Sequence, residues 1–364
     1  MDSLTQFVLG ATVSGALLGK ITGPRKAILI GGVLGTLPDL DVLLPTADAV
    51  SSFVDHRGWS HAFAVHALAT PVIGEALVRS IKALREARVR TWLAVFLCLT
   101  THALLDSLTI YGTRLFLPFS NEPVGLGSIF IIDPLYTLPL LFVAIWGLAT
   151  SRWSVNFGRA SVVALVLSSL YLCFGIVTQH KMVARAQAAF SQVGINPEHL
   201  LVQTTAFNSV VWRALVVDGD HFYNAYLSVF DDPDVQPTIY EYESGAYLSA
   251  CLADNQAFEK LAWFSRGYYM LSDNGGAAIV SDLRMGLTPN YVFSFLVAHA
   301  KDKRMIPVMP LRVESLRAFD EGDWEWLWKR MRGLRAVREP EAAAVLSSDK
   351  EDVVLKIQRS ADCG

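Results

Sequence analysis

The chain has 364 residues, 52% of them hydrophobic, a mean hydropathy of +0.36 and a net charge of −3. A nucleic-acid binder would present a basic face, so this charge excludes nucleic acid as an expected partner. The length allows two domains, and almost all of the apolar excess lies before residue 180. The opening Met-Asp, with no cation before Lys20, is not typical of a cleavable signal peptide.

Six apolar segments in the first 179 residues predict an α-helical polytopic membrane bundle of about five to six segments. The first is short for a span and could instead be re-entrant or tightly packed. Its glycines Gly10, Gly15 and Gly19 would let a neighbouring helix approach closely. The six segments cover residues 6–19, 27–44, 62–78, 91–110, 130–150 and 160–178.

The positive charges of this region indicate its orientation. Of the twelve Lys and Arg in the first 180 residues, only Arg57 and Arg114 fall outside the loops of one side if the segments alternate. The positive-inside rule places the other ten in the cytoplasm, and the N-terminus and everything after residue 179 outside it. The ten are Lys20, Arg25, Lys26, Arg79, Lys82, Arg85, Arg88, Arg90, Arg152 and Arg159.

After residue 180 the pattern predicts a soluble, extracytoplasmic α+β domain over 180–338, containing an antiparallel sheet. Runs 209–216 and 221–230 flank Asp218-Gly219-Asp220, and runs 268–271 and 277–283 flank a second Gly-rich turn, so each pair predicts a hairpin. A further strand is expected over 290–299, with helices at 185–193, 246–263 and 323–337. The tail 339–364 is polar and expected to be loosely held, and its Cys363 could pair with Cys251 in an oxidising compartment.

Three polar groups stand out in the apolar region. They are Asp39 and Asp41 after the helix-interrupting Pro38, the run from His56 to His61, and His102 with Asp106. Ionisable groups within hydrophobic segments are costly and by default indicate a functional site. The alternatives are a membrane-exit turn for the aspartates, packing histidines for the run, and a helix-stabilising pair for His102 and Asp106, whose i,i+4 spacing puts both on one helix face.

Together these residues predict one metal centre at the outer membrane face, with Asp39, His56, His61, His102 and Asp106 as the ligands. Mixed imidazole and carboxylate ligands suit zinc, and also manganese or iron, and the lack of a cysteine ligand argues against a closed structural zinc site.

Residues around these ligands are expected to serve the centre in other ways. Asp41 or Asp2 would complete the metal shell or act as the base. Arg57 would hold a phosphate with its planar fork, or else anchor the chain at the membrane interface. His66 is expected to pack or to support the site. No role is expected for His180, His199, His221 and His299.

These motifs, taken in order, resemble the YdjM-like family of bacterial membrane-bound metal-dependent hydrolases, itself distantly similar to zinc-dependent phospholipase C and P1-type nucleases. The resemblance covers about residues 1–150. It implies a hydrolase with the five ligands named above. Many relatives carry histidine where this chain has Gln6, so a sixth nitrogen ligand is not implied. The motifs are Met1-Asp2-Ser3-Leu4-Thr5, Leu37-Pro38-Asp39-Leu40-Asp41, His56 to His61, and His102-x-x-x-Asp106 followed by Tyr111-Gly112.

The expected function is therefore that of a multi-pass inner-membrane hydrolase that depends on a divalent metal. Its expected partners are membrane lipid and a small-molecule or lipid substrate, with a lipid-linked phosphoester the most natural choice at that depth. The alternatives are a non-enzymatic metal-binding scaffold or transporter whose soluble domain binds a partner, and a purely structural bundle.

Overall fold

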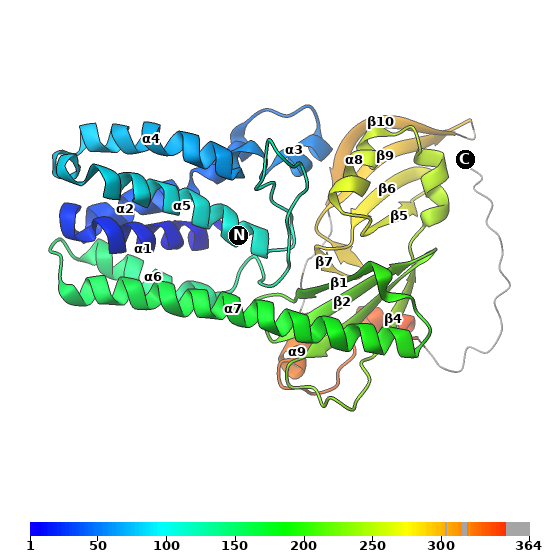
Figure 1. The fold of residues 1–364 in the computed structure, drawn as a ribbon. Helices are drawn as coiled ribbons and strands as arrows, with labels where there is room; N and C mark the ends of the chain where they lie inside the picture. Colours follow the sequence, from blue (N-terminus) through cyan, green and yellow to red (C-terminus); the bar gives the residue numbers. More distant parts are fainter. Residues whose placement is uncertain (303, 315–318, 320, 347–364) are drawn as a thin grey trace. The chain divides into compact units, whose positions relative to one another are not determined.

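The computed structural model describes residues 1–302, 304–314, 319 and 321–346. It shows an N-terminal helical region followed by an α+β region with antiparallel sheets (Figure 1). The chain divides into two compact units. Unit 1 comprises Met1–Pro45, Asp55–Val177 and Ala206–Ser209, and unit 2 comprises Thr46–Val54, Thr178–Thr205 and the described residues from Val210 onward.

Unit 1 is a bundle of apolar helices, and short 3₁₀ turns lie in some of the connections between them. The turns cover Pro38–Leu43, Trp59–His61 and Lys82–Ala87. The helices are α1 (Ser3–Thr22), α2 (Pro24–Thr36), α4 (Phe63–Ser80), α5 (Arg88–Leu108), α6 (Pro134–Ala149) and the first part of α7 (Val155–Gln192).

Three helical stretches of the described chain are long and apolar enough to cross a membrane: Ser3–Thr22, Lys82–Leu108 and Val155–Gln192. A fourth is added if α3 (Ala49–Asp55) and the turn after it form one broken span with α4, across a bend of 56°. The expected five to six segments are thus three or four candidate spans. The difference arises because α2 ends before Pro38 and because α6 has only 16 residues.

The close packing of α1 against α2 depends on glycine. Gly23, with φ of +83°, ends α1, and Pro24 begins α2, so the chain reverses within two residues. A Cβ atom on Gly31 would lie 2.1 Å from the carbonyl oxygen of Gly10, and one on Gly35 would lie 2.5 Å from that of Gln6. The close approach predicted at Gly10 is therefore confirmed, and it sets the position of the Gly35 backbone.

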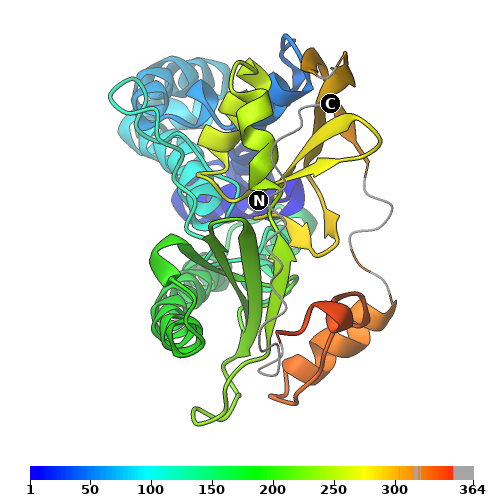
Figure 2. The same ribbon diagram turned by 90° about the vertical axis from the view of Figure 1, so that its right-hand side faces the viewer.

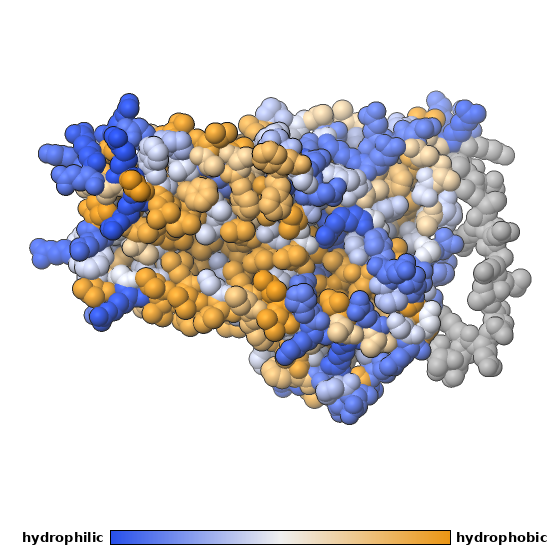
Figure 3. Space-filling view, in the orientation of Figure 1, coloured by the Kyte–Doolittle hydropathy of each residue, from blue (hydrophilic) through white to orange (hydrophobic). Residues whose placement is uncertain are grey.

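The two ends of unit 1 differ in charge. The connections α1–α2, α4–α5 and α6–α7 lie at one end of the bundle, on the left of Figure 1, and the N-terminus lies at the other. Hydrophilic residues gather at that left end, whereas the sides of the helices are largely apolar (Figure 3). Contacts tie the connections together, since Lys20 lies 5.8 Å from the Trp153 ring and Arg25 donates to the Leu148 carbonyl. The ten cations assigned to one side by sequence all belong to these connections or the helix ends beside them.

Unit 2 contains two four-stranded antiparallel sheets and a short two-stranded one (Figure 2). The first sheet has the order β1-β2-β3-β4 and the second β10-β9-β6-β5. The strands are β1 (Leu200–Thr204), β2 (Val211–Asp218), β3 (His221–Ser228), β4 (Ile239–Glu243), β5 (Tyr269–Asp273), β6 (Ala277–Asp282), β7 (Gly286–Leu287), β8 (Asn290–Tyr291), β9 (Ser294–Lys301) and β10 (Arg304–Val313).

Both predicted hairpins are confirmed. In the first, Asp218 pairs with His221 across Gly219, whose φ is +58°; in the second, β5 pairs with β6. The single strand expected over 290–299 is instead divided between β8 and β9. The helix expected over 246–263 is also interrupted: a 3₁₀ turn at Ala246–Leu252 precedes α8 (Gln256–Phe264), because the Asn255 side chain caps α8.

Other parts of unit 2 depart further from expectation. Residues 185–193 are the end of α7 rather than a separate helix, and α9 (Glu321–Arg330) is shorter than the expected 323–337. Residues 339–346 were expected to be loosely held, yet Glu341 is fully buried and accepts hydrogen bonds from Tyr226 and Tyr242. These two tyrosines lie about a hundred residues away, so a local pattern could not reveal them. Residues 347–364, and with them the possible pairing of Cys363, lie outside the described residues.

One segment from the first quarter of the chain belongs to unit 2. Thr46–Val54 lies between the two polar motifs of the N-terminal region. Its Phe53 ring, 6% exposed, packs against Phe264, Phe293 and Phe295 with ring centroids 5.0, 4.4 and 5.3 Å away. Aromatic clusters of this kind contribute beyond simple area burial, so Phe53 is an anchor of this segment.

The glycine contact between α1 and α2 gives a test of the packing. We expect Gly31→Leu to destabilise the protein by about 1–3 kcal/mol or more, because the new side chain meets the Gly10 backbone and the helices must separate. Thermal unfolding of the detergent-purified protein measures the effect. Val33→Leu, at a position 61% exposed on the same helix, is the control. Equal unfolding temperatures for the two variants would contradict the argument.

Candidate metal centre

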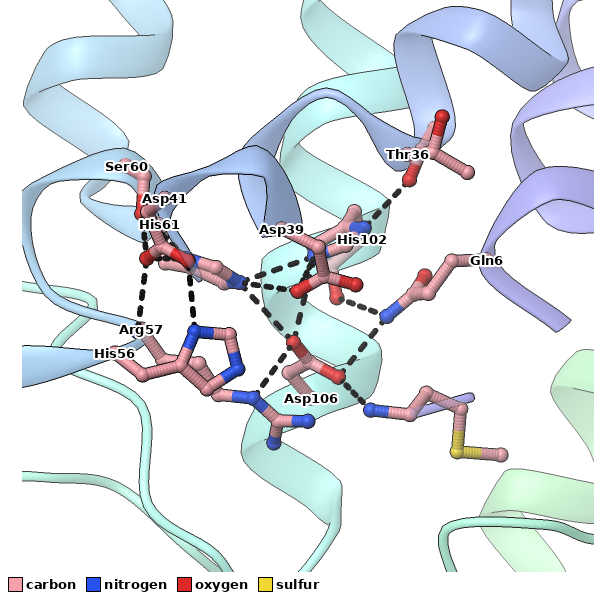
Figure 4. Close-up of polar contacts among 12 residues, drawn as sticks. Gln6, Thr36, Asp39, Asp41, His56, Arg57, Ser60, His61, His102 and Asp106 are labelled. Carbon is pink, nitrogen blue, oxygen red and sulfur yellow. Dashed lines mark hydrogen bonds and ion pairs between the residues drawn. The ribbon is translucent and has the colours of Figure 1, made fainter. Parts of the chain in front are cut away.

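Four side chains of unit 1 converge in one place: Asp39, His61, His102 and Asp106 (Figure 4). One ligand atom from each lies within 4.8 Å of the other three. Both histidines and Asp106 are buried, and the Asp39 side chain is 19% exposed. Each of the three sequence motifs therefore contributes to a single group.

Local structure explains how each side chain reaches the group. Pro38 starts a 3₁₀ turn that carries Asp39 just after α2. His61 ends the short turn before α4, and His102 and Asp106 lie one helical turn apart near the end of α5. The site lies at the same end of unit 1 as the N-terminus, opposite the cation-rich connections, since the Met1 amino group contacts Asp106.

The two imidazole rings meet through their Nε2 atoms, which are 3.0 Å apart. Asp39 Oδ1 lies 3.4 Å from both of these nitrogens. Asp106 Oδ2 lies 3.2 Å from His61 Nε2 and 3.4 Å from His102 Nε2. The four atoms thus enclose one small volume.

The hydrogen bonds around His102 fix its tautomer. Its Nδ1 lies 2.6 Å from the Gly35 carbonyl oxygen, which can only accept, so Nδ1 carries the proton. In the neutral ring Nε2 then presents a lone pair to the centre. Zinc-binding histidines are commonly oriented by such a bond from the other ring nitrogen.

A metal ion fits these residues. Asp39 Oδ1 and Asp106 Oδ2 are buried and have no hydrogen-bond partner among the described residues. Buried carboxylate oxygens without a donor are unfavourable. A cation between these oxygens and the two imidazole nitrogens would satisfy them together, and two nitrogen and two oxygen ligands suit zinc or another first-row divalent metal.

His56, the fifth ligand expected from sequence, is not in this group. Its Nδ1 lies 2.7 Å from Asp41 Oδ1, and its ring centroid is 6.0 Å from that of His61. Asp41 therefore pairs with His56 beside the centre (Figure 4). Burial alone would raise the pKa of Asp41, but hydrogen bonds from His56 and Ser60 outweigh it and lower that pKa below its usual range.

Arg57 is held against the centre and not in open solvent. Its φ of +63° is uncommon for a residue other than glycine, and its side chain is 5% exposed. Nε lies 3.3 Å from Asp106 Oδ2, and Nη1 donates to Thr109 Oγ1 at 3.2 Å. The guanidinium group also lies 4.8 Å from the centre of the Tyr111 ring. Its charge thus offsets that of the buried Asp106.

The remaining predicted residues lie close to the centre but outside the group of four. Asp2 accepts hydrogen bonds from the backbone and hydroxyl of Thr5, so it caps α1. His66 is buried and lies with Nε2 2.9 Å from the Ser60 carbonyl oxygen, which agrees with a supporting role.

Sequence reasoning missed several partners of the ligands. The Gln6 side chain donates to Asp106 Oδ1 at 3.0 Å. The hydroxyl of Ser60 contacts both Asp41 and His61. The position of Gln6 directly after Met-Asp-x-x-Thr was a usable signal, whereas nothing in the local sequence signals the Gly35 carbonyl.

Comparison with known proteins gives a family. The family model described as YdjM inner membrane protein matches residues 1–182, half of the chain. Over 150 residues the chain is 27% identical to the inner membrane protein YbcI of Escherichia coli K12, covering 40% of this chain and 78% of that protein. No solved structure matches the chain at a significant level. The matched region contains all four converging residues, and the chain belongs to the YdjM family of inner membrane proteins.

Proposed function

We propose that this inner membrane protein is a metal-dependent hydrolase whose substrate is a lipid-linked phosphoester. The observation that carries the proposal is the meeting of two imidazole nitrogens and two carboxylate oxygens, all within 4.8 Å, where neither oxygen accepts a hydrogen bond from a described residue. Zinc is the metal we favour, with manganese or iron as alternatives that the same ligands would accept.

Asp39, His61, His102 and Asp106 would hold the metal. A divalent metal bound there supplies Lewis acidity and lowers the pKa of a bound water, which is the chemistry that phosphoester hydrolysis needs. Four protein ligands can leave a position for water or substrate if the ion adopts five-coordinate geometry.

Asp41 and His56 would handle the proton. Because the Asp41 carboxylate accepts a hydrogen bond from Nδ1–H of His56, the neutral ring keeps a lone pair on Nε2. A histidine oriented in this way is a suitable general base and acid. In this proposal His56 acts beside the metal, as a proton carrier, and Asp41 orients it.

Arg57 would contact the substrate phosphate. Two of its three guanidinium nitrogens face Asp106 and Thr109, and Nη2 makes no hydrogen bond to any residue that the structure describes. A guanidinium already fixed on two sides loses little freedom on binding and can donate to a phosphate oxygen next to the metal.

Exposed apolar residues beside the ligands favour a lipid substrate. Leu40, Leu43 and Leu44, in and just after the turn that carries Asp39, are 52%, 76% and 66% exposed. Trp59, two residues before His61, is 58% exposed. Tryptophan is typical of the membrane interface, so these four residues, which we call the apolar rim, suit the acyl chain of a lipid whose head group reaches the metal.

The charge distribution of unit 1 suggests the orientation of the site. Its ten-cation end would face the cytoplasm, and the opposite end, with the metal centre, would face outward. The chain after residue 179 would then also be extracytoplasmic.

Substitution of single histidines should separate the ligands from the proton carrier. His61→Ala and His102→Ala should each weaken zinc binding by more than the 10–100-fold typical of losing an outer partner. His56→Ala should keep zinc but lose turnover. Metal analysis and a phosphodiesterase assay of detergent-purified protein measure both quantities, with His299→Ala, exposed in β9, as the control. Equal zinc content in wild type, His61→Ala and His102→Ala would reduce the motifs to packing features.

Changes in the apolar rim should alter substrate preference. Leu43→Ser with Leu44→Ser should lower kcat/KM for a lipid-linked phosphoester about tenfold or more. Burying two exposed leucine side chains against a bound acyl chain contributes a few kcal/mol to binding, and the serines would lose this contribution. Activity on the soluble bis(p-nitrophenyl) phosphate should change little. A parallel fall on both substrates would argue against a lipid-binding rim. Zinc binding by the wild type with no hydrolysis of either would favour a non-enzymatic metal-binding protein.

Reporter fusions test the orientation. We expect a fusion after residue 85 to read as cytoplasmic and one after residue 200 as extracytoplasmic, because of the ten-to-two distribution of cations. Alkaline phosphatase and green fluorescent protein fusions at both positions give opposite, internally checked signals. A cytoplasmic reading after residue 200 would contradict the outward placement of the site.

A further inference from the structure

Ser60 lies between Asp41 and His61, and its hydroxyl contacts both (Figure 4). Oγ donates to Asp41 Oδ2 at 2.6 Å and lies 2.9 Å from His61 Nδ1. A hydroxyl has one proton, and a carboxylate can only accept. The Ser60 oxygen must therefore accept its second hydrogen bond from His61, which places the His61 proton on Nδ1.

The hydroxyl is needed because Asp41 is too far away to do this directly. Asp41 Oδ2 and His61 Nδ1 are 3.8 Å apart, beyond hydrogen-bond range. Ser60 and Asp41 are both held in place. The Ser60 carbonyl oxygen lies 2.9 Å from His66 Nε2, and the Arg57 backbone N–H donates to the same Asp41 oxygen that the Ser60 hydroxyl contacts. Through the Ser60 hydroxyl, Asp41 thus determines which nitrogen of the His61 ring carries the proton.

We propose that Ser60, held by Asp41, is a positioning residue that fixes the proton of His61 on Nδ1 and leaves Nε2 free to bind the metal. Without it the proton can move to Nε2, where it would face His102 and occupy the position of the ion. The inference rests on the proposed function only in taking the centre to be a metal site, because the location of the proton is a property of the metal-free protein as well.

Two measurements on the full-length protein in detergent test this. The first is the zinc dissociation constant, from competition with a chromophoric chelator. The second is the ¹H–¹⁵N spectrum of ¹⁵N-histidine-labelled, metal-free protein, in which the Nδ1–H of His61 is identified by its loss in His61→Gln. We expect Ser60→Ala to weaken zinc binding about 10–100-fold and to lose the Nδ1–H signal of His61.

Ser60→Thr is the matched control, because it keeps the hydroxyl. It should retain both the signal and the zinc affinity to within about threefold. Asp41→Ala offers a second route if Ser60→Ala does not fold. It removes the carboxylate that accepts the Ser60 hydroxyl proton, so the hydroxyl can donate to His61 instead and the Nδ1–H signal should be lost in the same way.

The outcomes separate this inference from the proposed function. An unchanged Nδ1–H signal in Ser60→Ala, or weaker zinc binding with that signal intact, would overturn the positioning role. Wild-type protein that binds zinc but hydrolyses no phosphoester would remove the proposed hydrolase and leave the role of Ser60 standing. A wild type that binds no zinc would overturn both.

Discussion

The candidate metal centre depends on one electrostatic constraint: four electron-rich atoms are brought together where water is largely excluded. Two of them belong to carboxylates and two to imidazoles, and none can satisfy the others without a proton or a cation. Arg57 offsets part of the charge of Asp106, and Gln6 and the Met1 amino group occupy its other oxygen. The remaining oxygen is left facing the two rings. Much of the surrounding structure serves to keep these atoms in place.

The backbone packing of α1 against α2 contributes to that placement. The glycines of α1 and α2 let the two helices touch backbone to backbone, and this contact positions Gly35, whose carbonyl oxygen orients His102. The same pair of helices carries Gln6 to Asp106 and leads into the turn with Asp39. The packing of these helices therefore determines the geometry of the candidate ligands in this unit, because small residues set the helix separation.

The sequence was informative where chemistry and spacing act locally. The i,i+4 relation of His102 and Asp106, and the cost of placing ionisable groups in apolar segments, were enough to predict that three motifs would meet. The two hairpins of unit 2 followed from their turn residues.

Other features depended on geometry that no local pattern contains. Asp39 and Asp41 lie two apart in a 3₁₀ turn of three residues per turn, so they point in different directions and only Asp39 reaches the other ligands. The pairing of His56 with Asp41 follows from that difference. Hydropathy does not show where α2 stops, so the sequence could not reveal which of the expected segments are long enough to be candidate spans. The burial of Glu341 depends in part on tyrosines about a hundred residues away.

The placement of Phe53 affects how this protein can be divided. The region shared with the family ends at residue 182, yet the segment Thr46–Val54 inside it is held by rings from residues 264, 293 and 295. A chain shortened to the family region would leave a large aromatic side chain without its surroundings, on the stretch that joins Asp41 to His56. The segment between Asp41 and His56 thus depends on aromatic rings of the C-terminal half, and a chain that lacked that half would expose Phe53 unless this residue were replaced as well.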